Sequence, residues 1–354
     1  MVAHHLKKLL IMLLKVALSA TIIGYLAYAA TQHGDVFGNL RNQPKHWGIL
    51  AAAWGCCTVA VVLTFLRWWY LVRALDVPWR LRDAIRMGFW GFLFNLLPLG
   101  IVGGDLVKAV MFGHEQPKHR AKGVASVLFD RVVGLYLLFV VASSAMLLTG
   151  FYGRIDNHDI RLMCQVTFAL TLVGTIGLAV VLGPDLFVSR GIQACGRIPR
   201  IGRPLQSLLN AVRMYRRKPL ALFLTSLMSI GVHCTFAVGL YLIACGLPGN
   251  HLSLADHFVV IPVSNVAGVL PLPAGPFEAV LDLLYTLVPV NGPAITPGQG
   301  LVVALAYRIV TLLIAAFGLP YYLGNRREMA EVMHEAEETE EKEETERADH
   351  GAHS

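Results

Sequence analysis

Apolar residues run along this 354-residue chain in stretches of about 20, separated by short polar segments. A helix of about 20 residues is long enough to cross a hydrocarbon core of roughly 30 Å. Six unbroken stretches of that kind are predicted to span a membrane, at 9–30, 47–66, 123–150, 162–183, 220–246 and 300–323. The pattern therefore predicts an all-α polytopic membrane protein.

Two further apolar stretches, 84–112 and 258–290, are interrupted by proline and glycine. The first contains NLLPLGIVGGDLVKAV at 95–110, which also carries an aspartate and a lysine. A proline removes a backbone donor and ends a helix, and glycines allow a tight reversal of the chain. Neither stretch is expected to cross the membrane as a simple helix.

Charges in the loops predict the orientation. Basic residues are concentrated before the first span and in every second loop, at Lys7, Lys8, Arg67, Arg73, Arg80, Arg82, Lys118, Arg120, Lys122 and within 184–219. The opposite loops carry only Arg41, Lys45, Arg154 and Arg161. The positive-inside rule then places the basic set and both termini in the cytoplasm, in a multi-pass protein of the cell membrane.

This orientation makes both broken stretches return to the side from which they enter. Segment 84–112 has basic cytoplasmic flanks at both ends, and 258–290 lies between two outer loops. Each is therefore predicted to be a re-entrant helical hairpin, and the two hairpins enter from opposite faces. An ungapped alignment places Leu-Pro-Leu at 97–99 on Leu-Pro-Leu at 270–272 and Asp105 on Glu278. Such an inverted repeat is typical of transporters with a site at the bilayer midplane, the alternative being a chance match of short apolar strings.

Composition agrees with a membrane protein, because 55% of the residues are hydrophobic and only 15% are charged, against about 25% charged in soluble domains. The N-terminal apolar run exceeds a usual signal-peptide core, so an uncleaved first span is favoured over a signal peptide.

Residues 1–325 are predicted to form one transmembrane domain, and the glutamate-rich segment 326–354 a disordered cytoplasmic tail. Loop 184–219 is predicted to face anionic lipid headgroups through an amphipathic helix, or to act only as a topology signal. No nucleic-acid partner is expected.

Seven ionisable residues fall at apparent membrane depth: Asp105, Lys108, Asp130, Arg131, Glu278, Asp282 and Arg308. Each costs at least about 2.5 kcal/mol at a helix centre if it is unpaired, so such residues normally face a cavity and pair. Glu278 and Asp282 share a helix face, with Arg308 as their natural partner. Lys108 lies where its hairpin leaves the membrane, so it has the alternative of snorkelling to the interface.

The turn glycines Gly103, Gly104 and Gly275 are expected to let backbone approach a ligand closely. The half-helices that follow would begin near Gly104 and Gly275, and their free N–H groups would form an anion site. Asp105 and Glu278 can cap those groups.

Chemistry other than lipid binding has little support in the sequence. A metal pair held by Glu278 and Asp282 is left as an alternative, although no histidine or third acid lies at helical spacing. No cofactor motif or catalytic motif is found, and the six cysteines are interpreted as packing residues.

Four strings, NLLPLGIVGGDLVKAV, SVLFDRVVGLYLL, LPLPAGPFEA and ALAYRIVTLL, resemble the lysylphosphatidylglycerol synthase transmembrane family over roughly residues 9–323. The family more often has a glycine-rich turn before the second acid, where this chain has Pro276 and Phe277. The resemblance implies lipid translocation. The larger relatives, the multiple peptide resistance factors, flip aminoacylated phosphatidylglycerol and carry a soluble transferase domain that this chain lacks, so no synthase activity is expected.

The predicted function is therefore a flippase for an anionic or aminoacylated phospholipid, or for a polyprenyl- or hopanoid-type lipid. The alternatives are an intramembrane enzyme and an accessory subunit, each acting in lipid-headgroup modification. The substrate-binding residues are predicted to be Asp105, Asp130, Arg131, Glu278, Asp282 and Arg308, with Gly103, Gly104 and Gly275.

Overall fold

The structure is a computed structural model, which describes residues 2–33, 36–95, 100–182 and 210–324 except 211, 269, 271, 273 and 291–292. The predicted acidic tail, 326–354, lies outside these residues. So do most of loop 184–219 and the prolines Pro98, Pro271 and Pro273 of the two predicted turns.

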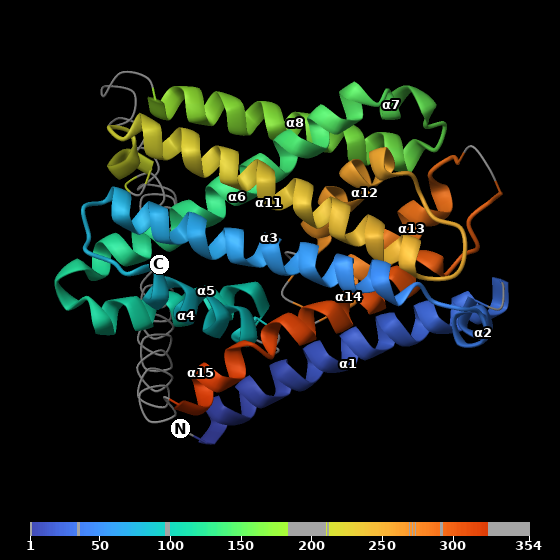
Figure 1. The fold of residues 1–354 in the computed structure, drawn as a ribbon, viewed down its shortest axis with the longest axis horizontal. Helices are drawn as coiled ribbons and strands as arrows, with labels where there is room; N and C mark the ends of the chain where they lie inside the picture. Colours follow the sequence, from blue (N-terminus) through green and yellow to red (C-terminus); the bar gives the residue numbers. More distant parts are fainter. Residues whose placement is uncertain are drawn as a thin grey trace.

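The described residues form a bundle of helices (Figure 1). The helices are α1 (Val2–His33), α2 (Val36–Asn42), α3 (Trp47–Ala74), α4 (Leu81–Phe94), α5 (Gly100–Glu115), the 3-10 turn η1 (Pro117–His119), α6 (Arg120–Leu148), α7 (Phe151–Arg154), α8 (His158–Leu182), α11 (Pro219–Gly246), α12 (Leu254–Ala267), α13 (Pro276–Leu287), α14 (Gln299–Ala315) and α15 (Gly318–Gly324). The all-α prediction is confirmed for the part of the chain described.

Six segments are long and apolar enough to cross a membrane: Met12–Gln32, Trp47–Ala74, Pro117–Leu148, His158–Val180, Pro219–Gly246 and Gln299–Tyr321. They overlap the six predicted spans, so that prediction is confirmed. One boundary was wrong, because the second span was predicted to end at residue 66 and α3 continues to Ala74. Arg67 and Arg73, which were assigned to a loop, therefore lie in a helix.

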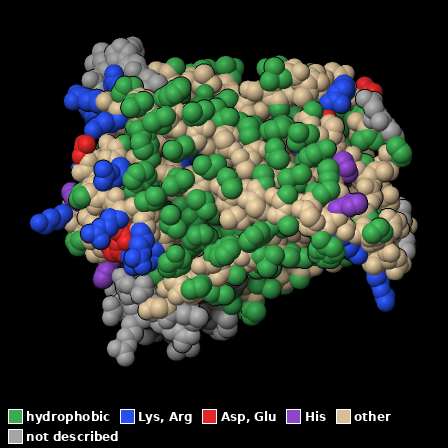
Figure 2. All heavy atoms as spheres, viewed as in Figure 1, with side chains coloured by type: hydrophobic (Ala, Val, Ile, Leu, Met, Phe, Trp, Pro, Cys, Tyr) green, Lys and Arg blue, Asp and Glu red, His purple; other side chains and the backbone are tan. Residues whose placement is uncertain are grey.

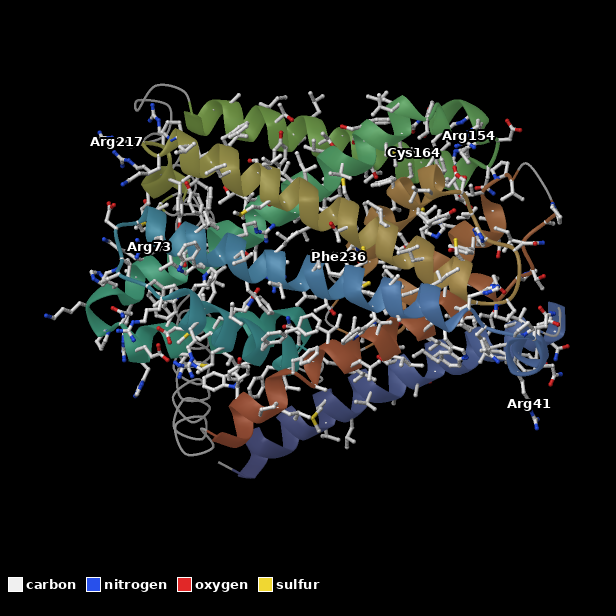
Figure 3. The ribbon with its side chains drawn as sticks, in the orientation of Figure 1. Arg41, Arg73, Arg154, Cys164, Arg217 and Phe236 are labelled. Carbon is white, nitrogen blue, oxygen red and sulfur yellow. The ribbon has the colours of Figure 1, made fainter. Side chains whose placement is uncertain are left out.

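Charged side chains gather at the two ends of the bundle, and an apolar band lies between them (Figure 2). Arg73 and Arg217 lie at one end, and Arg41 and Arg154 lie at the other (Figure 3). This division separates the same two sets of loops as the predicted topology does.

Two pairs of short helices occupy opposite ends of the bundle (Figure 1). In the first pair α4 packs against α5, and in the second α12 packs against α13. At 12 to 16 residues each, these helices are shorter than a full span.

Helix α3 links the two ends of the bundle. It packs along α11, and it contributes to both buried apolar clusters. One cluster joins α3 to α11, α12, α13 and α14, and the other joins it to α4, α5 and α6. Residues at different positions along α3 therefore border both pairs of short helices.

Candidate functional site

An aspartate and an arginine pair between α5 and α6. Arg131 Nη2 donates to Asp105 Oδ1 at 2.7 Å, and Arg131 Nε donates to Asp105 Oδ2. Two parallel bonds between a guanidinium and a carboxylate are the strong, directional form of this contact. Arg131 lies 11 residues into α6, which is roughly 16 Å along the helix, so the pair sits far from the bundle end.

Lys108 lies one turn beyond Asp105 on α5. Its ammonium is 4.0 Å from Asp105 Oδ1, and its side chain is only 12% exposed. The rings of Phe65 and Trp68 lie on α3, each with its centroid 5.8 Å from the lysine nitrogen. The lysine stem passes close to Gly91, where a methyl group would lie 2.5 Å from Lys108 Cε. Lys108 therefore packs against α3 and α4 inside the bundle.

A second ion pair lies beside the first. Arg67 Nε and Nη2 donate to the two oxygens of Asp130 at 2.7 and 3.0 Å. Arg67 Nη1 also donates to Ser229 Oγ of α11 at 2.7 Å. The arginine side chain is 6% exposed, so this group ties α3, α6 and α11 together in the interior.

Arg67 is the member of this site that sequence reasoning missed. It was counted among the cytoplasmic loop charges, yet the surrounding string TFLRWWYLV is apolar on both sides of the arginine. An arginine flanked in this way within an apolar helix is expected to face a buried acid. That signal was available in the sequence.

The second half of the chain has its own carboxylate–arginine pair. Arg308 Nε of α14 donates to Glu278 Oε1 at 2.5 Å, as the predicted partnership requires. The other oxygen of Glu278 accepts from the backbone N–H of Gly275 at 2.7 Å. Glu278 is fully buried, and Gly275 has a φ of +112°, which glycine adopts without strain. The predicted cap at the start of this half-helix is therefore confirmed.

The corresponding cap at Asp105 is wrong. Helix α5 begins at Gly100, so Gly103 and Gly104 lie inside it and Asp105 is beyond its first turn. The N–H of Gly104 donates to Asn95 Oδ1 at 3.2 Å, and a methyl group on Gly104 would lie 2.1 Å from the carbonyl oxygen of Gly91. Glycine at 104 is needed for close contact between α4 and α5 and not for the turn.

Replacing Gly104 with alanine is expected to destabilise the protein by about 1–3 kcal/mol, because the new methyl group must displace the α4 backbone. The measurement is the thermal unfolding midpoint of the purified protein in detergent. Gly177→Ala is the control, because that glycine in α8 has nothing within 4 Å of its added methyl group. A Gly104→Ala protein as stable as Gly177→Ala would contradict this assignment.

Asp282 belongs to a different contact from the one predicted. Its Oδ1 accepts from the backbone N–H of Leu301 at 3.0 Å, in the first turn of α14. A carboxylate at that position satisfies free helix donors and meets the positive end of the helix dipole. Arg308 was expected to serve both acids, but it pairs with Glu278 while Asp282 caps the helix on which Arg308 lies.

The three ion pairs thus form two half-sites, one for each pair of short helices. The first half-site comprises Asp105, Arg131, Lys108, Asp130 and Arg67, and the second comprises Glu278, Arg308 and the backbone of Gly275. Asp105 and Glu278 are the two acids aligned from sequence, and each holds the arginine of the next long helix. Within the described ranges, no group of three or more histidine, cysteine, aspartate or glutamate side chains is placed to hold a metal ion.

Comparison with family models matches residues 12–318 to the transmembrane region of lysylphosphatidylglycerol synthase. The chain belongs to this family. The match covers all six candidate spans except the last three residues of Gln299–Tyr321, and it includes both half-sites. A search of curated proteins and a search of solved structures returned no match.

Proposed function

We propose that this family member is a flippase, which moves a lipid with a phosphate-bearing or aminoacylated headgroup between the two leaflets. The observation that carries the proposal is the presence of two carboxylate–arginine pairs, Asp105–Arg131 and Glu278–Arg308, far from the ends of the long helices α6 and α14 of an apolar bundle. Ionised groups at that depth are costly and normally serve a substrate or ion path.

The two helix pairs fit an inverted repeat. We assign α4–α5 and α12–α13 as re-entrant hairpins, because each returns to the end of the bundle from which it starts (Figure 1). Helix α6 begins at one end of the bundle, and Arg131 lies 11 residues beyond its start. Helix α14 begins at the other end, and Arg308 lies nine residues beyond its start. With both termini in the cytoplasm, each half-site would serve a headgroup arriving from its own face of the membrane.

The chemistry of the step is an exchange of counter-ions. A lipid phosphate, like a carboxylate, offers two charged acceptor oxygens to a guanidinium fork, so it can replace Asp105 on Arg131 or Glu278 on Arg308. The arginine side chains are 42% and 35% exposed, whereas Glu278 is completely buried. The headgroup would meet the guanidinium first, and the carboxylates would restore neutrality when the headgroup leaves.

The direct test is leaflet exchange of headgroup-labelled lipids in liposomes that contain the purified protein. Exchange of at least one phospholipid class above the rate in protein-free liposomes is expected, and unchanged exchange across anionic, zwitterionic, aminoacylated and polyprenyl phosphate lipids would refute the proposal. Lipid extracts taken from the same liposomes test the enzyme alternative, because a new lipid species would indicate headgroup chemistry and not transport.

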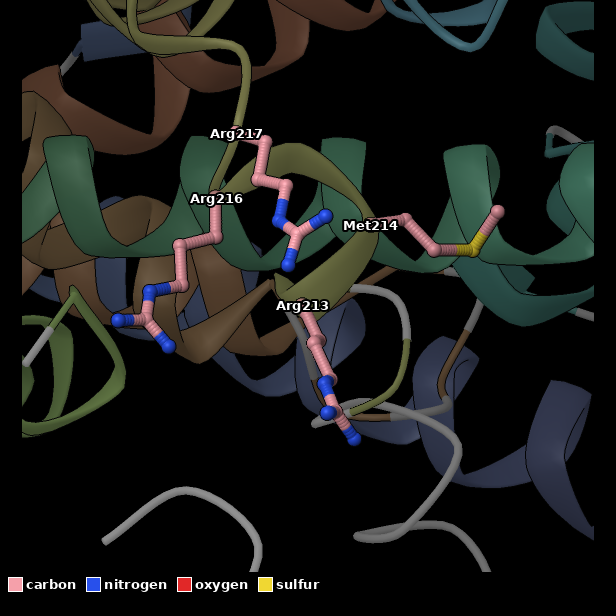
Figure 4. A pocket seen from close by; sticks show the side chains of 4 residues that line it. All are labelled: Arg213, Met214, Arg216 and Arg217. Carbon is pink, nitrogen blue, oxygen red and sulfur yellow. The ribbon is translucent and has the colours of Figure 1, made fainter. Parts of the chain in front are cut away.

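A surface hollow lies just before the start of α11. It is lined by Arg213, Met214, Arg216 and Arg217 (Figure 4), at the same end of the bundle as Arg73 (Figure 3). Clusters of basic residues at this level of a membrane protein attract anionic headgroups. We propose that these arginines contact anionic lipids of the adjoining leaflet, as was predicted for loop 184–219.

A further inference from the structure

The charges of the first half-site do not balance. Among the described residues, the charged side chains around Lys108 are Asp105 at 4.0 Å, its partner Arg131, and the adjoining Asp130–Arg67 pair. Together with Lys108 itself, the set has three cations and two anions, a net charge of +1. An excess charge enclosed by apolar helices is costly, so its retention calls for a counter-ion.

Lys108 is the cation that remains after pairing. Both oxygens of Asp130 are taken by Arg67, and both oxygens of Asp105 are taken by Arg131. Lys108 Nζ reaches only to within 4.0 Å of Asp105 Oδ1, beyond hydrogen-bond distance. The described side chains therefore provide each arginine with a carboxylate of its own, and they leave the three donors of Lys108 for another acceptor.

The second half-site lacks this surplus cation. The alignment that pairs Asp105 with Glu278 places Lys108 on Leu281, which is fully buried in the apolar core. Glu278 and Arg308 balance each other at that half-site. The excess positive charge is thus a feature of the first half-site, at the end of the bundle that carries Arg73.

The surroundings of Lys108 strengthen an ionic contact. Two aromatic rings and the adjacent glycine hold the side chain in place and exclude most of the water around it. In such surroundings the attraction between a lysine and a phosphate is much larger than at an open surface. Arg131, whose side chain is 42% exposed, lies on the other side of Asp105 and can contribute a second cation.

We propose that Lys108 is a phosphate contact of the headgroup path beside Arg131, and that the lipid recognised there carries an ionised phosphate. The inference rests on the proposed function for the step that follows binding. It deepens that function in two respects. Uncharged glycolipids are excluded from this half-site, and the half-site at the opposite end binds headgroups more weakly.

The test measures binding of water-soluble lipids to the intact protein in a non-ionic detergent. Binding is detected as an increase in the thermal unfolding midpoint of the protein. The probes are dihexanoyl phosphatidylglycerol, uncharged dihexanoylglycerol and inorganic phosphate. Wild-type protein and Lys108→Arg should be stabilised by the phospholipid and not by dihexanoylglycerol. Lys108→Gln should require at least tenfold more phospholipid for the same shift. Lys45→Gln, at a half-buried residue of the opposite end, should bind as the wild type does.

The outcomes separate this inference from the proposed function. Equal phospholipid binding by wild type and Lys108→Gln, or no binding by the wild type, would overturn the role of Lys108. If inorganic phosphate displaces the phospholipid, the phosphate is the recognised group. If the phospholipid binds and inorganic phosphate does not displace it, the whole lipid headgroup is recognised. Both results support the site. Lysine-dependent binding without leaflet exchange in liposomes would refute the flippase while leaving this site in place.

Discussion

Arg131→Gln and Arg308→Gln should each reduce leaflet exchange about 10- to 150-fold, because each removes a charge-assisted hydrogen bond worth about 1.5–3 kcal/mol to the headgroup. Glutamine keeps a polar side chain but cannot form the charged fork. The measurement is the initial rate of exchange of a headgroup-labelled phospholipid in liposomes with equal protein content. Normal rates in both variants would contradict the assigned phosphate role.

The two single variants differ in their structural cost, and this difference provides the control. Removal of Arg308 leaves Glu278, which is fully buried, with the Gly275 N–H as its one remaining partner among the described residues. The double change Glu278→Gln/Arg308→Gln removes that stranded charge, so it should restore much of the lost stability without restoring exchange. If the double variant also recovered exchange, Arg308 would be a structural residue and not a headgroup ligand.

Hydrophobic pattern alone predicted much of this fold, because the bilayer imposes one length on every crossing helix. The six spans were found within a few residues, apart from the end of α3. The breaks that divide α4 from α5 and α12 from α13 were also predicted, since proline and glycine interrupt both apolar stretches. The acid and arginine of each half-site followed from the cost of burying charge, which permits few arrangements.

The parts that could not be predicted depend on contacts between distant segments. Nothing near Asp282 in the sequence indicates that its carboxylate meets Leu301, 19 residues later, at the start of α14. The function of Gly104 was misassigned for the same reason, because its close neighbour Gly91 lies on the preceding helix. Arg67 was misassigned differently, by counting a charge as a loop marker before asking whether the apolar pattern continued beyond it.

Substitution of Arg67 by methionine is expected to destabilise the folded protein by about 3–5 kcal/mol, the usual cost of breaking a buried ion pair by removing one partner. The change removes the two hydrogen-bond donors of the Asp130 carboxylate in the interior, where Arg67 had joined α3, α6 and α11. The measurement is thermal and denaturant unfolding in detergent, followed by tryptophan fluorescence. Asp130→Asn should be destabilised in the same direction.

The paired replacement Arg67→Met/Asp130→Leu distinguishes a packing effect from a charge effect. Removing both charges should recover most of the loss, since apolar residues of similar size often replace a buried ion pair without cost. The matched control is Lys218→Met, whose partner Asp76 is 78% exposed, so that pair should contribute only about 0–1 kcal/mol. Two results would show that the buried charge is not what makes Arg67 necessary. One is an Arg67→Met protein with the unfolding midpoint of the wild type. The other is a double variant no more stable than either single variant. If instead the double variant is stable but exchanges lipid slowly, the Arg67–Asp130 pair acts on transport as well as on stability. The pair would then act by fixing Asp130 beside Arg131 and by contributing to the electrostatic potential at Lys108.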